Sequence, residues 1–281
     1  RRTFRSDFEK KFAKLCGRKH AISVSSGSAA LEIAVHALGI KNGDEVILPT
    51  FTIISCVAPL IRIGAIPVLI DADPLTWNMD VKQIEQRISS RTRAIIAAHT
   101  YGLPVDMDPL LSLAKSHGLI VIEDAAEAHG LLYKGRICGS FGDISTFSFY
   151  ANKLITTGEG GMAVTDDDKI AEKCRSLRNL CFQKEKRFIH EELGWNFRMT
   201  NIQAALGLAQ IERLEEFIIK KRNMGKRYTT LLKNLEHIQL PLKGTKYSEN
   251  IYWIYGLVLD ADIPDNADSI MKKLKNCGIG T

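Results

Sequence analysis

The sequence lacks several features that would place it in other classes of protein. No apolar run approaches the roughly 20 residues that a membrane-spanning helix needs. No segment near the first residue has the charged, apolar and small-residue order of a signal peptide. With 45% hydrophobic and 25% charged residues, the composition is typical of a globular chain, and we expect a soluble one.

Cysteine pairs at metal-binding spacing are also missing. The six cysteines are Cys16, Cys56, Cys138, Cys174, Cys181 and Cys277. None of them belongs to a C-x-x-C pair, so the sequence predicts no zinc site, no iron–sulfur site and no other metal. Scattered cysteines in a chain of this size are usually buried, reduced thiols, and we therefore expect a cytoplasmic location.

Basic residues do not gather into a stripe. Lysine and arginine number 38 against 32 acidic residues, but only Lys220, Lys221 and Arg222 form a dense cluster. A nucleic-acid-binding surface needs a concentrated basic stripe, usually with aromatic residues between the charges. We therefore expect neither nucleic acid nor membrane as a partner, and the net charge of +6 suits small anionic molecules equally well.

What the sequence does contain is an alternation of short apolar runs and helical patterns. The apolar runs predict strands at 20–24, 45–48, 67–71, 93–99, 119–124 and 144–149. Helical spacing predicts helices over 3–15 and 29–38, and 263–276 contains a later one. Buried strands separated by helices indicate an α/β fold, with a mostly parallel central sheet and helices on both faces. The strands' carboxyl ends would then meet at one edge, where ligands bind.

Residues 200–235 have a different pattern. Apolar residues recur every three positions from Ile202 to Phe217, which predicts one long helix linking a large domain to a smaller one. We place the boundary so that 1–217 form the large, ligand-binding domain and 218–281 form an incomplete C-terminal small domain. The run at 251–259 resembles the last strand.

Polar groups follow two of the expected strands. Ser25–Ser28 (SSGS) stands between a strand and a helix, where free N–H groups form an anion site, although an ordinary serine cap is the alternative. Asp124 ends the strand at 119–124 and, if buried, needs a cationic partner. Alone, it is more simply a helix cap. Because side chains alternate along a strand, Glu123 should face away from the side that Asp124 faces.

Lys153 lies between the strand at 144–149 and a Gly-rich turn, GEGG, at 158–161. A loop lysine is usually only solvated, but this position indicates a pocket. Burial lowers the pKa of a lysine and favours the neutral amine that a nucleophile needs. An anion site, a carboxylate and an amine together are the set that pyridoxal 5′-phosphate (PLP) needs for its phosphate, its ring nitrogen and its aldehyde.

Four stretches resemble the DegT/DnrJ/EryC1/StrS family of PLP-dependent sugar aminotransferases, whose members have the aspartate-aminotransferase fold, type I of the PLP-dependent transferases. They are residues 25–52, 99–130, 133–165 and 193–214, in the family's order. Within the family, ANKLITTGEGG with EDAAEA is most similar to the GDP-perosamine synthase group. The 8-amino octulosonate synthase group is also similar in these stretches.

The resemblance implies roles for individual residues. Lys153 holds the Schiff-base position and is the catalytic residue that moves a proton between the cofactor and the substrate. Asp124 pairs with the pyridine nitrogen, and Glu127, where the family often has Gln, hydrogen-bonds the ring's 3-oxygen. The phosphate is held by Ser28, by the backbone of Ala29 and by Ser148. Asn196 reaches the phosphate of the neighbouring subunit, so the resemblance implies a homodimer with shared active sites.

The implied activity is transfer of an amino group from glutamate to a keto group of a nucleotide-linked deoxy sugar, a 4-keto-6-deoxy hexose, for surface polysaccharide or a related glycan. Two departures from the family stand out. Ile53 replaces the aromatic residue that usually stacks on the cofactor ring. Family members also extend further at both ends, so we expect this chain to be part of a longer protein and to stop inside the small domain.

Three alternatives make different demands on the sequence. A PLP-dependent sugar dehydratase of the same family has His at the lysine position, and Lys153 argues against it. A non-catalytic regulatory or scaffold protein with this fold would not need Lys153, Asp124 and Ser148 intact. A nucleotide-binding Rossmann protein needs G-x-G-x-x-G after its first strand, and SSGSAA lacks that motif.

Overall fold

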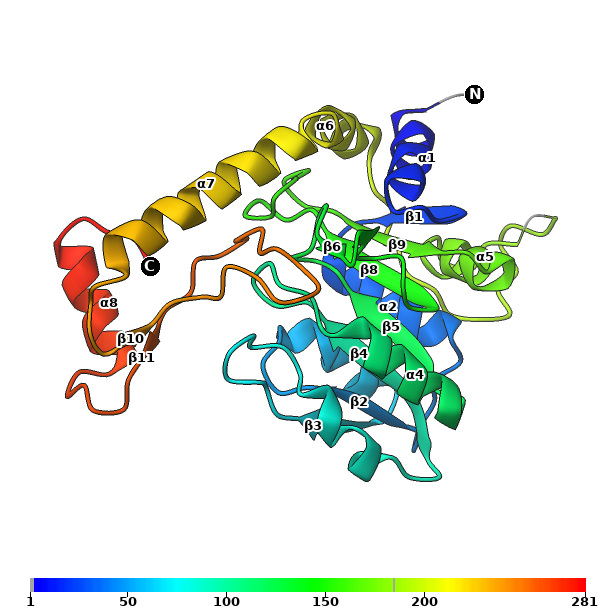
Figure 1. The fold of residues 1–281 in the computed structure, drawn as a ribbon. Coiled ribbons are helices and arrows are strands. Elements are labelled where there is room, and N and C mark those ends of the chain that lie inside the picture. The colour runs from blue at the N-terminus through cyan, green and yellow to red at the C-terminus, as the bar shows by residue number, and fades with distance from the viewer. Residues whose placement is uncertain (1–2, 184) are drawn as a thin grey trace.

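A seven-stranded sheet forms the centre of the computed structural model, which describes residues 3–183 and 185–281 (Figure 1). Its strands are β1 (His20–Val24), β2 (Glu45–Pro49), β3 (Ile66–Ile70), β4 (Thr92–Ala98), β5 (Ile120–Asp124), β8 (Ile144–Ser148) and β9 (Gly161–Thr165). They lie in the order β1-β9-β8-β5-β4-β2-β3. All pairs between β8 and β3 are parallel, whereas β9 is antiparallel to both β8 and β1. The predicted mostly parallel sheet is confirmed.

Helices and short elements surround the sheet. The helices are α1 (Phe4–Leu15), α2 (Gly27–Ala37), α3 (Ala58–Arg62), α4 (Met107–His117), α5 (Asp168–Leu177), α6 (Asn201–Ile211), α7 (Leu214–Leu232) and α8 (Ala267–Asn276). The short helical turns are η1 (Ile54–Cys56), η2 (Val81–Gln83) and η3 (Glu85–Arg87). Two small hairpins pair β6 (Leu132–Tyr133) with β7 (Arg136–Ile137) and β10 (Ile238–Gln239) with β11 (Val258–Leu259). Within the described ranges, no helix is both long enough and apolar enough to cross a membrane.

Two hydrophobic cores lie on opposite faces of the sheet. Ile95 belongs to one core and its neighbours Ala94 and Ile96 to the other, because successive side chains of a strand point to opposite faces. Helices α1, α4 and α6 contribute to the first core, and α2, α3 and α5 to the second. The predicted cover of helices on both faces is therefore confirmed.

The carboxyl ends of the central parallel strands lie together at one edge of the sheet. The parallel strands β4, β5 and β8 end there at Ala98, Asp124 and Ser148. Antiparallel β9 begins at the same edge, because Gly161 pairs with Ser148. The loop that carries Lys153 therefore leaves the sheet and returns to it at this edge.

The single long helix predicted for residues 200–235 is wrong. The structure has two helices, α6 and α7, which are separated at Glu212 and Arg213, where Arg213 has the non-helical angles φ −111° and ψ 8°. In a helix of 3.6 residues per turn, each step of three residues shifts the side chain by about 60° around the axis, so one straight helix cannot keep this repeat on one side. The break at Glu212 and Arg213 changes the direction of the helix axis. Helix α7 passes through residue 217, and the domain boundary there remains our proposal.

The predicted strand at 251–259 is also mostly wrong, since within that range only Val258 and Leu259 form a strand, β11. The preceding residues instead form a loop that returns to the segment after β4. Ile251 donates from its backbone N–H to the oxygen of Gly102 at 3.1 Å. Tyr252 has a left-handed φ of 50°, which a strand cannot contain. The turn directs the next side chain, Trp253, toward Lys153.

Candidate active site

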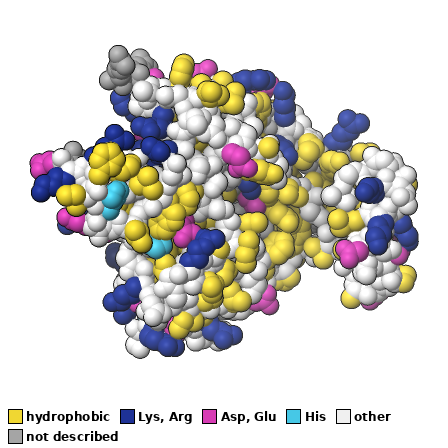
Figure 2. Space-filling view, turned by 180° about the vertical axis from the view of Figure 1, so that it is seen from behind, with side chains coloured by type: hydrophobic (Ala, Val, Ile, Leu, Met, Phe, Trp, Pro, Cys, Tyr) yellow, Lys and Arg dark blue, Asp and Glu magenta, His cyan; other side chains and the backbone are white. Residues whose placement is uncertain are grey.

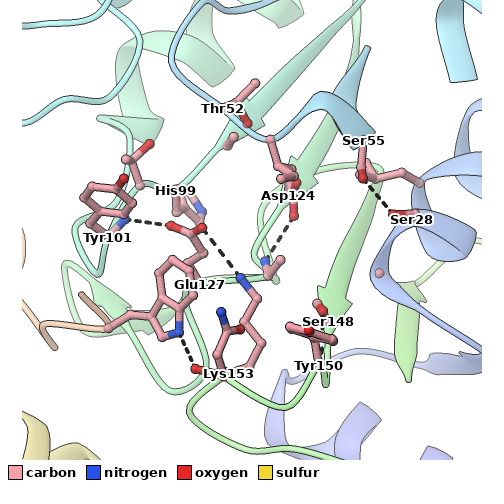
Figure 3. A pocket seen from close by; sticks show the side chains of 18 of the residues that line it. Ser28, Thr52, Ser55, His99, Tyr101, Asp124, Glu127, Ser148, Tyr150 and Lys153 are labelled. Atoms are coloured by element: carbon pink, nitrogen blue, oxygen red, sulfur yellow. Dashed lines mark hydrogen bonds and ion pairs between the residues drawn. The ribbon is translucent and has the colours of Figure 1, made fainter. Parts of the chain in front are cut away.

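A cavity of about 520 Å³ lies at the polar edge of the sheet (Figure 3). Its lining comes from segments far apart in the sequence, which meet because the strands end together. Among the lining residues are Ser26, Gly27, Ser28, Ile53, Ser55, His99, Tyr101, Asp124, Glu127, Ser148, Asn152, Lys153 and Trp253. Five of the predicted site residues are among them, namely Ser28, Asp124, Glu127, Ser148 and Lys153.

The start of α2 forms one end of the cavity. Its first N–H groups have no acceptor within the helix, which makes a helix start favourable for an anion. Ser28 Oγ lies 2.7 Å from Ser55 Oγ, and both hydroxyls border the cavity. A Cβ on Gly27 would lie only 2.7 Å from Ser148 Cβ, so glycine is what lets the helix approach β8. The arrangement gives the cavity an end rich in hydroxyl and N–H donors.

Ala29 is placed differently from the expectation. Its N–H donates to Ser26 Oγ at 3.0 Å, and Ser26 is the cap of α2. Ala29 itself is buried and does not line the cavity. Both interpretations of the SSGS motif therefore apply at once, because Ser26 caps the helix while Ser28 faces the cavity.

Asp124 ends β5 with its carboxylate at the cavity wall. The N–H of Ala126 donates to Oδ1 at 3.1 Å, and the thiol of Cys56 donates to Oδ2 at 3.2 Å. The residue is only 5% exposed, so a cation that entered the cavity would meet a largely desolvated carboxylate. This is the environment in which a carboxylate keeps a heterocyclic nitrogen protonated.

Glu123 faces the other way, as strand alternation predicts. His99 Nε2 lies 2.8 Å from its Oε1, and Ser145 Oγ donates to its Oε2 at 3.0 Å. Val105 N–H donates to His99 Nδ1 at 3.1 Å, so the hydrogen of a neutral ring sits on Nε2 and points at Glu123. The hydrogen bonds of His99 lower the pKa of the buried Glu123 to about 2, against the effect of burial. This network fixes the orientation of His99, whose ring borders the cavity.

Lys153 and Glu127 face each other across the cavity. The Nζ of Lys153 lies 3.6 Å from Glu127 Oε1, and Tyr101 N–H donates to Glu127 Oε2 at 2.8 Å. Burial lowers the pKa of Lys153, and it raises the pKa of Glu127 to about 7 even though Lys153 and the Tyr101 N–H act against it. Figure 3 shows both side chains pointing into the same space as Asp124.

Trp253 is the site residue that the sequence interpretation missed. Its ring centroid lies 3.7 Å from Lys153 Nζ, and its Nε1 donates to the backbone oxygen of Asn152 at 3.0 Å. It also packs against Tyr101, with ring centroids 6.1 Å apart. The only signal in the sequence is aromatic density, since three of the four residues at 252–255 are aromatic in a chain with 7% aromatic residues.

Two further residues expected in the site, Ile53 and Asn196, lie at the margin of the cavity and outside it. Ile53 borders the cavity and is 58% exposed. Asn196 is exposed and outside the cavity, where it forms an isolated bridge with Asn179 and its Oδ1 accepts from Arg198 Nε at 2.9 Å. The structure therefore brings Asn196 to the surface of its own chain and not to the cavity of that chain.

The residues present fit PLP. The cavity has a hydroxyl- and N–H-rich end for a phosphate, a desolvated carboxylate for a ring nitrogen and a buried amine for an aldehyde. All three are carried by strand ends, by the loop after β8 and by the start of α2. The fold and the site thus define a PLP-dependent transferase of fold type I.

Comparison with known proteins places the chain within that class. Residues 3–281 match the model of the DegT/DnrJ/EryC1/StrS aminotransferase family, and the chain belongs to that family. It is 44% identical to the GDP-perosamine synthase of Caulobacter vibrioides over 97% of this chain and 74% of that protein. It is 45% identical to the GDP-perosamine synthase of Escherichia coli O157:H7 over 89% of this chain and 68% of that protein.

A solved structure gives the same result. The structure of DesV of S. venezuelae, in complex with a ketimine intermediate, has a TM-score of 0.91 and 34% sequence identity, covering 99% of this chain and 73% of that one. The predicted family and fold type are confirmed, and the cofactor of the chain is PLP.

Proposed function

We propose that this chain is a PLP-dependent aminotransferase that moves an amino group from glutamate to a keto group of a nucleotide-linked deoxy sugar. The observation that carries the proposal is the amine of Lys153, which lies in one cavity with Asp124, Glu127 and the start of α2. A 4-keto-6-deoxy hexose linked to GDP is the first substrate to test, because two close relatives are named GDP-perosamine synthase. The product would serve a surface polysaccharide or a related glycan.

Each site residue has a separate task in this proposal. PLP, when bound, withdraws electrons from the amino-bearing carbon so that a proton can leave it. The phosphate is held by Ser28, Ser148 and the N–H groups that begin α2, and Asp124 holds the ring nitrogen. Lys153 would take a proton on Nζ from the donor carbon and pass it to the cofactor, and it would carry a proton the opposite way when the keto sugar receives the amino group. Trp253 covers Nζ and keeps bulk water from it.

The identity of residue 153 separates amino transfer from the related dehydration. A lysine amine offers both a nucleophile for an aldehyde and a base for the proton. Burial keeps a larger share of that amine neutral, which both tasks require. The dehydratase alternative, which needs a residue other than lysine here, is not supported by this chain. A scaffold protein would not require an amine at this position in the cavity.

The active form in this proposal is a homodimer in which Asn196 reaches the phosphate bound by the partner subunit. Exposed apolar side chains near Asn196 in the sequence support an interface there, since Phe188 is 81% and Leu193 92% exposed. Figure 2 shows hydrophobic side chains spread over the face turned away from the view of Figure 1. The free cysteines support a reducing compartment, so we propose that the reaction takes place in the cytoplasm.

The test is a screen of nucleotide-linked 4-keto sugars with glutamate, read by mass spectrometry. We expect one sugar to gain an amino group in place of its keto oxygen while glutamate becomes 2-oxoglutarate. Omitting glutamate provides the control for donor identity. Loss of water from a sugar without gain of nitrogen would instead support the dehydratase alternative, and no PLP binding at all would support a scaffold.

A further inference from the structure

We propose that Cys56 is a positioning residue for Asp124, holding the carboxylate that faces the cofactor ring and setting how much negative charge it presents to the ring nitrogen. The inference rests on the proposed function, since it assigns Asp124 to the ring nitrogen of PLP. Cys56 is fully buried at the end of η1, 68 positions before Asp124 in the sequence. It is not among the residues that line the cavity, so it acts through Asp124 and not by direct contact with the cofactor.

The hydrogen bonds around Asp124 are directional. A carboxylate accepts hydrogen bonds and does not donate them, so the Sγ–Oδ2 contact of 3.2 Å requires the thiol of Cys56 to donate. Thr52 Oγ1 lies 3.3 Å from the same sulfur, and with the thiol hydrogen committed to Asp124, the hydroxyl of Thr52 donates to sulfur. The three groups form one chain of donors that ends at Oδ2, while Ala126 N–H holds Oδ1.

Burial keeps this donor in place at every working pH. Desolvation raises the pKa of the Cys56 thiol well above its usual value, and the negative charge of Asp124 raises it further. The thiol therefore stays protonated. The remaining charged groups near Asp124 are Glu127 and Lys153, whose charges act on it across the cavity. Glu127 and Lys153 are both retained when only Cys56 is replaced.

The choice of sulfur has a chemical consequence. A thiol is a weak hydrogen-bond donor compared with a hydroxyl, so it orients the carboxylate without drawing much charge from it. Asp124 then keeps most of its negative charge to attract a protonated ring nitrogen. A serine at this position would donate more strongly and weaken that attraction, whereas an alanine would strengthen the attraction and loosen the geometry.

The test compares Cys56→Ser, Cys56→Ala and the control Cys174→Ala in the PLP-loaded protein. Cys174 is buried in the same hydrophobic core, and its sulfur donates to the backbone oxygen of Ile33 at 3.9 Å, outside the cavity. The readouts are the pH at which the visible absorption of bound PLP titrates and the dissociation constant of PLP, with melting temperature as the measure of packing.

We expect the two Cys56 variants to move the titration in opposite directions by on the order of half a pH unit. Cys56→Ala should also weaken PLP binding by roughly three- to tenfold, less than is usual for a lost hydrogen bond to a charged group because a thiol is a weak donor. Cys174→Ala should lower the melting temperature and move neither readout.

Titrations that stay at the wild-type pH, or that move in the same direction in both variants, would show that Cys56 only fills the core. Cys56→Ser keeps the size of the side chain and so tests the proposal even if Cys56→Ala fails to fold. A wild-type protein that binds no PLP would overturn the proposed function itself, and this inference with it, whereas wild-type binding with unchanged variants would overturn the inference alone.

Discussion

The carboxylate of Glu127 lies 3.6 Å from the amine of Lys153, and burial opposes the charge on both groups. Each group partly restores the charge of the other by attraction across the cavity. Burial therefore brings the pKa values of the two groups closer together, because it lowers that of Lys153 and raises that of Glu127. A larger neutral share of the Lys153 amine is what proton uptake at Nζ requires.

Replacement of Lys153 by alanine should abolish amino transfer while leaving the fold intact. The variant loses both the amine for the aldehyde and the base for the proton, so we expect turnover to fall by about 10⁴-fold or more. Steady-state assays with glutamate and the accepted sugar check this. Lys134→Ala is the matched control, since that lysine is exposed and pairs with Asp108 outside the cavity. Full turnover by Lys153→Ala would contradict the mechanism.

Glu127→Gln should change how the stability of the PLP-free protein depends on pH. Folding raises the pKa of Glu127 from 4.5 to about 7, so the native state favours the protonated form. Its contribution to stability is therefore complete below pH 4.5 and is lost as the pH rises through about 7. The loss amounts to about 3 kcal/mol at most.

Urea unfolding of the PLP-free protein from acidic to mildly alkaline pH measures this effect. The free energy of unfolding of the wild type should fall relative to that of Glu127→Gln as the pH rises. Parallel curves for the two proteins would mean that folding leaves the pKa of Glu127 unchanged.

Mixing two inactive variants tests whether active sites are shared. A subunit with Lys153→Ala still supplies Asn196, and a subunit with Asn196→Ala still supplies Lys153. Random exchange places one intact site in half of the dimers, which restores about a quarter of the wild-type activity. Native mass spectrometry verifies the exchange. No recovery in a verified mixture would place Asn196 outside the partner's site.

Gly27→Ala should weaken PLP binding, because the added Cβ would lie 2.7 Å from Ser148 Cβ and force α2 away from β8. Overpacking of this kind costs about 1–3 kcal/mol of stability. At Gly280, by contrast, an added Cβ meets no heavy atom within 4 Å, so Gly280→Ala serves as the control. Equal PLP affinity in both variants would show that the helix start does not hold the phosphate.

Much of the fold follows from local sequence patterns. The strand predicted at 20–24 is β1 to the residue, and the opposite orientations of Glu123 and Asp124 follow from strand alternation alone. The break between α6 and α7 does not follow, since no glycine or proline marks Glu212 and Arg213. Local signals of helix termination are absent there, and tertiary packing decides the end of the helix.

The site was predictable to the extent that it lies at strand ends. Lys153, Asp124 and Ser28 follow from the rule that parallel strands present their carboxyl ends at one edge. The contributions of Trp253 and Cys56 depend on loops that reach the cavity from elsewhere, and no periodicity reports such a contact. The phosphate proposed as the partner of Asn196 would be bound by another subunit, and Asn196 lies outside the cavity of its own chain.

The bond from Trp253 to the backbone of Asn152 joins positions that are 101 residues apart in the chain. During synthesis, the sheet edge with Lys153 therefore leaves the ribosome long before the residue that covers it. The enclosure of the Lys153 amine thus depends on residues made after the sheet edge, and the cover over the cavity is complete only when the loop at 250–254 is in place.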